Sequence, residues 1–406
     1  MIIPTGLNKI VSAFTILFLL FLSCAIDVTS VSAFSIVVDT TNDEEIDDST
    51  CSLREAVQAA VNHADYYGCT GGSTAWVTLP SGIYTVDIDT LPSINTAITI
   101  HGAGSSKTFI QASSCNPTKE SCSENHRLFY VANNGALTLE NLTIRNGYVE
   151  DTYGGAIWNN QGTLNIYNSV FSTNKSRRGG AIENSGALYI TESTFSSNMV
   201  GVDQAAGAIF NYNLSQSAFI EKSTFLNNSA NYGGAIWNTG SGGILEMENC
   251  TFSGNTAGNY GGALVNNGVA ILTNNTFSEN SADTGAGIYV AAGKDLSLTN
   301  TIITYSQGGD CANYGTISTN INNLIEDGSC NPTYKGDPLL SSLGNYGGQT
   351  QTHALLMGSV AIDSANIGAC PDTDQRGVGR PQGVGCDIGA YEKEPTNFTY
   401  LPLILK

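Results

Sequence analysis

Hydrophobic and polar residues alternate in a short motif that the chain repeats between residues 164 and 280. Its five copies are LNIYNSVFSTN, LYITESTFSSN, FIEKSTFLNN, LEMENCTFSGN and ILTNNTFSEN. Their phenylalanines, at spacings of 24, 30, 27 and 25 residues, are Phe171, Phe195, Phe225, Phe252 and Phe277. An apolar residue at every second position indicates a half-buried β-strand. A repeat of this length predicts one turn of a solenoid, because one turn is too short to bury its own apolar face.

A second motif, Gly-Gly-Ala-Ile, alternates with the first. Its copies are TYGGAIWN, RRGGAIEN, AAGAIFN, NYGGAIWN, NYGGALVN and TGAGIYV, beginning at Thr152, Arg177, Ala205, Asn231, Asn259 and Thr284. The glycines permit a tight corner, and the apolar residue after them begins another strand. Three short strands per turn predict an all-β fold, a single-stranded right-handed parallel β-helix whose turns lie about 4.8 Å apart.

Asparagines recur at two corners of each predicted turn. One column follows the phenylalanines and contains Asn174, Asn198, Asn228, Asn255 and Asn280; the other follows the glycine motif and contains Asn159, Asn184, Asn211, Asn238 and Asn266. Stacked amide side chains can hydrogen-bond along such a column, which favours a structural role. The alternative is N-glycosylation, whose acceptor triplets begin at Asn141, Asn174, Asn213, Asn227, Asn249, Asn274 and Asn397.

The ends of a β-helix expose strand edges and core, so we expect capping segments. SLREAVQAAVN, about 52–62, predicts an amphipathic helix that begins with a Ser52–Glu55 capping box. The predicted organisation is an N-terminal cap with irregular turns over 34–125, regular repeats over 126–305, a C-terminal region over 306–395 and a tail over 396–406. Within the C-terminal region, Arg376 and Arg380 are expected to pair with Asp387 and Glu392.

Residues 1–33 carry an apolar run and a Val-Ser-Ala ending, which predict a secretory signal peptide; an uncleaved anchor is the alternative. No later stretch is long and apolar enough to span a membrane. The formal net charge is −19, and it does not change when residues 1–33 are removed, because Lys9 and Asp27 cancel. A surface this acidic argues against a nucleic-acid partner.

Ten cysteines are typical of an oxidising compartment. Cys24 lies in the signal segment, and Cys250 occupies the position that Ser169 and Ser193 hold in sibling repeats. Proximity in sequence pairs the other eight as Cys51 with Cys69, Cys115 with Cys122, Cys311 with Cys330, and Cys370 with Cys386. Other pairings of eight cysteines remain open.

Three regions resemble bacterial protein families. The alternating Phe-x-x-Asn and Gly-Gly-Ala-Ile motifs resemble the repeats of polymorphic outer membrane proteins, which implies a surface-exposed β-helix with a role in adhesion. CSLREAV at residues 51–57 is similar to the motif of the CSLREA-domain family. The segment from DPLLSSLGNYGGQTQTHALL through DQRGVGRP to CDIGAYE, residues 337–392, resembles the choice-of-anchor Q domain, which implies cell-surface attachment.

An outward position recurs directly after the apolar residue of each glycine motif. It holds Trp158, Glu183, Phe210, Trp237, Val265 and Tyr289, so four of the six residues are aromatic. An exposed aromatic row is a plausible platform for the apolar faces of sugar rings. Tyr153, Tyr232 and Tyr260 would widen it. The alternative is that a loop covers the row or that these rings belong to the core.

The competing class is an enzyme acting on polysaccharides, which needs paired carboxylates or a metal site. The carboxylates of the repeats look scattered, with none at equivalent outward positions of adjacent turns, and the four histidines show no metal-ligand spacing. We therefore expect no catalytic residue, no metal and no cofactor. The favoured function is a secreted or outer-membrane-associated module that contacts surface glycans or components of neighbouring cells; a polysaccharide lyase or glycoside hydrolase, or a structural surface-layer component, are the alternatives. The oligomeric state is not predicted.

Overall fold

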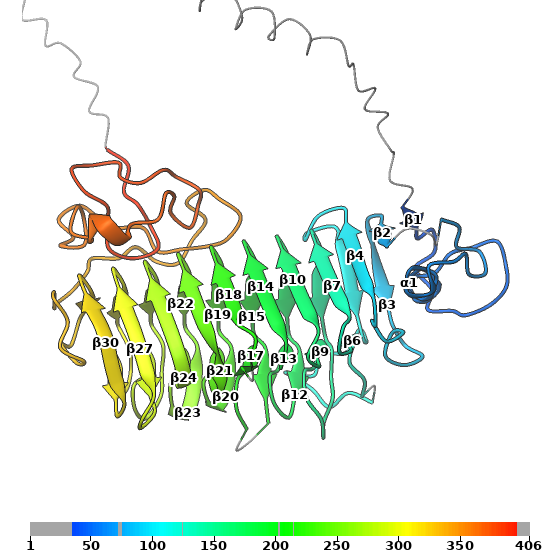
Figure 1. Cartoon of the computed structure of the whole chain (residues 1–406), viewed down its shortest axis with the longest axis horizontal. Helices are drawn as coiled ribbons and strands as arrows, with labels where there is room; N and C mark the ends of the chain where they lie inside the picture. The colour runs from blue at the N-terminus through cyan, green and yellow to red at the C-terminus, as the bar shows by residue number, and fades with distance from the viewer. Residues whose placement is uncertain (1–34, 72–74, 124, 202–203, 214, 396–406) are drawn as a thin grey trace, which may run out of the picture. The chain divides into compact units, whose positions relative to one another are not determined.

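The repeated motifs form strands that stack in parallel, one turn upon the next (Figure 1). The computed structural model describes residues 35–71, 75–123, 125–201, 204–213 and 215–395. The predicted signal peptide and tail lie outside the described residues. The predicted parallel β-helix is confirmed, and the proposed boundaries at residues 125 and 305 stay predictions.

The largest sheet has 17 strands in two parallel runs. The first run is β1 (Ile36–Val37), β2 (Trp76–Leu79), β4 (Ala97–Gly102), β7 (Ala136–Glu140), β10 (Thr163–Tyr167), β14 (Ala187–Thr191), β18 (Ala218–Glu221), β21 (Ile236–Glu248), β24 (Leu264–Thr273), β27 (Asp295–Thr299) and β30 (Thr316–Ile321). The second is β6 (Phe129–Val131), β9 (Ile157–Asn159), β13 (Ile182–Asn184), β17 (Ile209–Asn213), then β21 and β24 again, β26 (Ile288–Val290) and β29 (Cys311–Asn313). The long strands β21 and β24 join the runs because each carries both motifs without a break.

The phenylalanine motif supplies a second, ten-stranded sheet. Its strands are β3 (Gly82–Thr85), β5 (Thr108–Gln111), β8 (Thr143–Arg145), β11 (Val170–Ser172), β15 (Thr194–Ser196), β19 (Thr224–Leu226), β22 (Thr251–Ser253), β25 (Thr276–Ser278), β28 (Ile302–Thr304) and β31 (Leu324–Ile325). A small third sheet of four strands was not predicted, because its short segments lack an alternating pattern. They are β12 (Lys175–Ser176), β16 (Met199–Val200), β20 (Ser229–Tyr232) and β23 (Thr256–Tyr260).

The phenylalanines form one internal column of stacked rings. Phe171, Phe195, Phe225, Phe252 and Phe277 are all fully buried. Successive ring centroids lie 4.9, 5.0, 4.7 and 4.6 Å apart, with interplanar angles of 11° or less. The spacing equals one strand separation, so the register of the strands sets the stacking of the rings.

The asparagine column beside the phenylalanines is a buried hydrogen-bonded ladder. The amide of Asn198 donates to Oδ1 of Asn228 at 3.0 Å and to the carbonyl of Phe171 at 2.9 Å. The backbone N–H of Asn198 donates to the same Oδ1 at 3.0 Å. Equivalent bonds link Asn174 to Asn198, Asn228 to Asn255 and Asn255 to Asn280. Each turn therefore satisfies polar groups of the turns beside it, which a buried amide requires.

Burial also limits N-glycosylation. Asn174, Asn249 and Asn274 have no exposed surface in the folded chain. A glycan needs an accessible acceptor, so these three triplets cannot be modified once the protein has folded.

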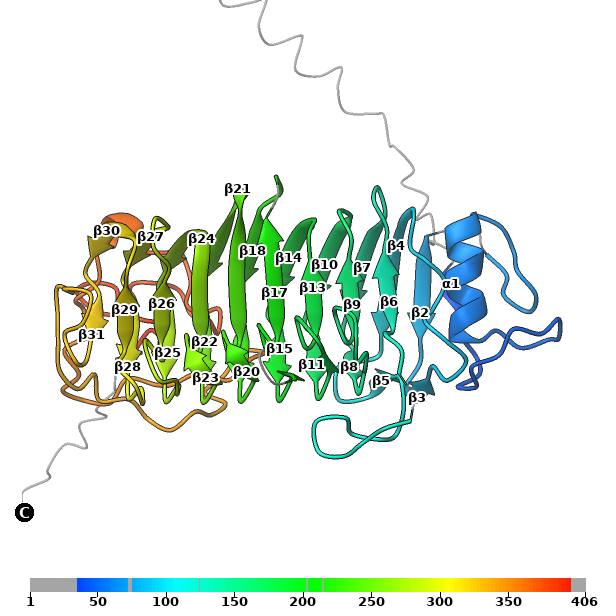
Figure 2. The same ribbon diagram turned by 90° about the horizontal axis from the view of Figure 1, so that it is seen from below.

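A helix covers the N-terminal turn. Helix α1 (Leu53–Asn62) contacts β1 and β2, and Figure 2 shows it beside β2. Its predicted capping box is present, since Glu55 N–H donates to Ser52 Oγ at 3.2 Å and Ser52 N–H donates to Glu55 Oε2 at 2.9 Å. Arg54 adds a buried ion pair with Asp43 at 2.8 Å that the sequence pattern did not indicate.

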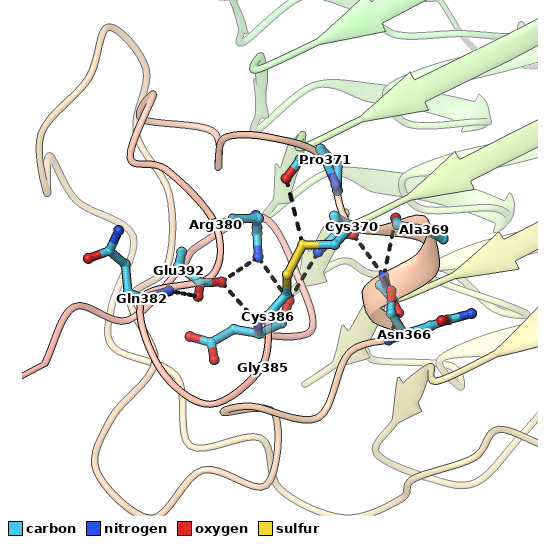
Figure 3. The surroundings of a disulfide bond; sticks show 12 residues. Asn366, Ala369, Cys370, Pro371, Arg380, Gln382, Gly385, Cys386 and Glu392 are labelled. Atoms are coloured by element: carbon cyan, nitrogen blue, oxygen red, sulfur yellow. Dashed lines mark hydrogen bonds and ion pairs between the residues drawn. A yellow bond between two sulfur atoms is a disulfide. The ribbon is translucent and has the colours of Figure 1, made fainter. Parts of the chain in front are cut away.

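The four proposed disulfides are present. They join Cys51 to Cys69, Cys115 to Cys122, Cys311 to Cys330 and Cys370 to Cys386, while Cys250 is a free, buried thiol. The last bond lies beside the 3₁₀ turn η1 (Ile367–Ala369) and near Arg380 and Glu392 (Figure 3). Each bridge closes a loop of fewer than twenty residues, which restrains the unfolded chain locally.

Residues 337–395, the docked segment, pack against the ten-stranded sheet. Gln375 accepts a hydrogen bond from Thr251 at 2.6 Å and donates one to Thr224 at 3.0 Å. Asn274 donates to the carbonyl of Asp387 at 3.0 Å. Arg380 pairs with Glu392 at 2.8 Å as expected, but Arg376 pairs with Asp374 instead of Asp387. Asp374 is closer in sequence and is itself fully buried, so it takes the guanidinium.

His353 should make the docking of this segment sensitive to acid. Its Nδ1 lies 2.8 Å from the Ser341 carbonyl and must donate to it, so Nε2 accepts from Ser253 Oγ at 3.1 Å. Burial lowers the pKa of His353 below its usual value. The folded state therefore binds fewer protons than the unfolded state below pH ~6.5, and the contribution of this residue to stability falls as the pH drops.

We expect hydrogen exchange of residues 337–395, corrected for intrinsic rates, to speed up between pH 7.5 and 5. The His353→Gln variant should show a smaller change, because glutamine does not titrate. Asp387 contributes in the opposite direction, because burial raises its pKa to about 6. Both proteins contain Asp387, so comparing them removes its contribution. An identical pH response in both proteins would rule His353 out as the sensor.

Candidate glycan-contacting surface

The predicted outward column lies in register on six neighbouring strands. Backbone pairing places Trp158 beside Glu183, Glu183 beside Phe210, Phe210 beside Trp237, Trp237 beside Val265 and Val265 beside Tyr289. Tyr130 on β6 extends the column by one turn before Trp158. Tyr130 was not predicted from the sequence, because its motif LFYV lacks the glycines of the later copies.

Tyrosines from the neighbouring corner lean against this column. Tyr153 packs edge-on against Trp158 at 5.9 Å between ring centroids, and Tyr232 packs in the same way against Trp237 at 6.1 Å. Tyr260 stacks on Tyr289 at 4.3 Å. We call the rings of both columns the aromatic ridge. Its ring contacts form two clusters: a short one of Tyr130, Tyr153 and Trp158, and a longer one of Phe210, Tyr232, Trp237, Tyr260, Tyr289 and Tyr314.

The prediction of an exposed aromatic row is wrong for the middle of the row, where the side chains are buried. Phe210 is only 7% exposed and Glu183 only 2%, and Val265 is buried as well. The guanidinium of Arg178 lies 4.1 Å from the ring centroid of Tyr153 and 4.2 Å from that of Phe210, so it covers the row. Trp158, Trp237 and Tyr289 keep part of their surface in solvent, and Tyr314 is exposed.

Arg178 also fixes the charge within the ridge. Its Nε donates to Glu183 Oε2 at 3.0 Å, and its Nη2 donates to Oε1. Burial raises the pKa of Glu183 to about 7, against the opposing effect of Arg178 and Arg127. Arg127 lies 5.0 Å from the ring centroid of Trp158. The Glu183 carboxylate is paired with a guanidinium inside a packed aromatic cluster. This arrangement suits a structural ion pair better than a general acid or base, which must be accessible to substrate.

A second outward surface corrects the expectation about carboxylates. Glu221 on β18 pairs in register with Glu248 on β21, and Phe219 pairs with Glu246. Two carboxylates therefore occupy equivalent outward positions of adjacent turns. Glu221 and Glu248 each lie four residues before the phenylalanine of their repeat, Phe225 and Phe252, so the sequence itself contains the signal for this register.

The histidines do not meet. His101 pairs with Glu140 at 3.1 Å, His126 contacts the Val86 carbonyl, and His353 lies in the docked segment. Within the part of the chain that the structure describes, no group of three or more His, Cys, Asp or Glu side chains is arranged to hold a metal ion.

Comparisons with known proteins agree with the repeat and the fold. The Chlamydia polymorphic membrane protein (Chlamydia_PMP) repeat matches residues 222–239 and 249–267. The crystal structure of pectate lyase Pel9A is similar over 89% of this chain and 96% of its own, with a TM-score of 0.50 and 15% identity. Geobacillus virus E2 ORF18 aligns over 71% of this chain and 60% of its own, with a TM-score of 0.38 and 14% identity. No curated protein matches the sequence.

At this identity, the likeness to the pectate lyase is one of fold alone. The repeat covers two adjacent turns, which contain Trp237 of the ridge and Phe252 of the core. Among the described residues, no helix combines the length and the apolar character that crossing a membrane requires.

Proposed function

We propose that this protein is an exported surface module that binds glycan chains along the aromatic ridge without changing them chemically. The observation that carries the proposal is the longer part of the ridge, in which rings from successive turns touch without a break from Tyr232 to Tyr314. The apolar faces of sugar rings can pack against the exposed parts of such rings, and a row with one strand spacing between rings suits a polymer rather than a single sugar.

Location is part of the proposal. The polymorphic membrane protein repeat fits a bacterial surface or outer-membrane protein, and four disulfides fit an oxidising compartment. The signal peptide over 1–33 and the choice-of-anchor Q resemblance belong to the same proposal, since each would place the chain outside the cell; the CSLREA resemblance is proposed with them and implies no location of its own.

Replacing Trp237 by alanine tests the ridge. We expect the full-length chain to be retarded during native electrophoresis through gels containing hydroxyethyl cellulose, galactomannan or xylan. Trp237→Ala should weaken the retaining interaction by about tenfold, which corresponds to about 1.4 kcal/mol for lost stacking. The matched control is Trp76→Ala, because Trp76 is an exposed tryptophan on β2 outside the ridge. Retention by none of the three polysaccharides, or equal retention of both variants, would contradict the proposal.

A polysaccharide lyase or hydrolase is the second candidate. The pectate lyase fold and the in-register pair of Glu221 and Glu248 favour it, while the net charge of −19 opposes an acidic polymer such as pectate. Assays for unsaturated products and new reducing ends, on the same polysaccharides and on polygalacturonate, separate the two functions. Product that accumulates with time would support the enzyme.

A further inference from the structure

A stacked pair of aromatic rings lies exposed on the first run of the large sheet. Tyr189 on β14 and Phe219 on β18 pair in register, with ring centroids 5.4 Å apart and planes 8° from parallel. Their side chains are 40% and 38% exposed. The buried residues beside them, Ile190 and Ile220, already fill the core. Because the two rings stack on each other from one turn to the next, they cover their facing sides and leave the rest of their apolar surface in solvent, on a sheet that does not need it for packing.

This pair forms one wall of a surface hollow of ≈ 360 Å³. Tyr167 extends the aromatic wall, and Glu221, Glu246 and Glu248 supply the polar part of the lining. Thr191 donates to Glu221 at 3.2 Å and Asn249 donates to Glu248 at 3.4 Å, so each of these carboxylates keeps further acceptor capacity.

Negative charge dominates the hollow. Burial and the nearby Glu221 and Glu246 raise the pKa of Glu248, whereas Lys222 and Arg380 act in the opposite direction. Arg380 is already paired with Glu392, which leaves Lys222 as the counter-charge close to three carboxylates. A bound cation would relieve the repulsion among the carboxylates, and a uronate would add to it.

We propose that this hollow binds a polymer of amino sugars with free amines, whose rings pack against the exposed parts of Tyr189 and Phe219 and whose ammonium groups face Glu221, Glu246 and Glu248. Charge complementarity selects the occupant: the carboxylates accept hydrogen bonds and favour a cation, and the paired rings favour a ring-shaped ligand. A neutral sugar would satisfy the rings alone. A lysine-rich peptide would satisfy the carboxylates alone. The site is separate from the aromatic ridge and does not depend on it.

Calorimetric titration with three hexamers tests the proposal on the full-length chain. At a pH where the sugar amines are protonated, the β-1,4-linked glucosamine hexamer should bind at least tenfold more tightly than the N-acetylglucosamine hexamer or hexalysine. Tyr189→Ala should weaken binding of the glucosamine hexamer about tenfold. The isosteric triple variant Glu221→Gln, Glu246→Gln, Glu248→Gln should abolish it, and added salt should weaken it.

Trp76→Ala is the matched control that should leave glucosamine binding unchanged, because Trp76 is an exposed tryptophan outside both surfaces. Trp237→Ala damages the ridge alone and measures what the ridge contributes. A variant that loses polysaccharide binding at the ridge but still binds the glucosamine hexamer, or one that loses only the hexamer, separates this inference from the proposed function. Equal affinity for the acetylated hexamer would show that charge is not recognised. Equal affinity for hexalysine would show that the rings are not used and point to a peptide. Either result, or no binding of the glucosamine hexamer, overturns the proposal.

Discussion

Replacing Phe225 by alanine should lower the free energy of unfolding by about 3–5 kcal/mol. Phe225 is fully buried and stacks between Phe195 and Phe252, at 5.0 and 4.7 Å. Alanine would remove the ring and leave a cavity between two rings that the strand register holds in place, so the column cannot collapse to fill it. Urea denaturation, with the midpoint and slope fitted together, measures the loss.

Phe219→Ala is the matched control for this substitution. It removes the same atoms six residues earlier, but from a partly exposed side chain on the solvent face. We expect it to cost less than about 1 kcal/mol. Similar losses for the two variants would mean that the phenylalanine column does not form the core.

Replacing Arg380 by methionine should have the second largest effect, about 3–5 kcal/mol, because it leaves the buried carboxylate of Glu392 without its partner. Arg380 also donates to the carbonyls of Asp387 at 2.9 Å and Gly389 at 2.7 Å. The loss should be local, since turns of a solenoid interact mainly with their neighbours. Hydrogen exchange should quicken over residues 337–395 and stay slow in β7, β10 and β14.

The double variant Arg380→Met, Glu392→Met is the control for the buried charge. It removes both members of the pair, so it should be more stable than Arg380→Met alone. If Arg380→Met is as stable as the wild type, or if its hydrogen exchange quickens evenly along the solenoid, this ion pair does not hold the docked segment in place.

The sequence predicts the strands and both structural columns because each repeat carries the same residues at the same places. Once Phe195 and Phe225 are recognised as equivalent, parallel stacking requires that they touch. The disulfides could also be predicted from the sequence, because each joins cysteines that are close in sequence. In these cases the determining interactions are local or repeat from turn to turn.

The rest depends on contacts that no repeat encodes. Thr224 and Thr251 face outward, yet both are fully buried because the docked segment returns over them from more than a hundred residues away. Arg178 covers the aromatic row because it replaces the tyrosine found at that corner in other turns. The carboxylates of the hollow are an exception, because Glu221 and Glu248 each lie four residues before a phenylalanine of the column, so their register could be predicted from the sequence.

Both proposed surfaces require that matching outward residues of successive turns lie side by side. Engineered cysteines test this directly, because a disulfide needs Cα atoms about 4.4–6.8 Å apart. Asn165 and Tyr189 are paired in register, whereas Asn165 and Thr191 are offset by two residues and therefore about 8 Å apart. Mass spectrometry after mild oxidation should find a cross-link in the Asn165→Cys, Tyr189→Cys variant and not in the Asn165→Cys, Thr191→Cys variant. A cross-link in the offset variant alone would contradict the account.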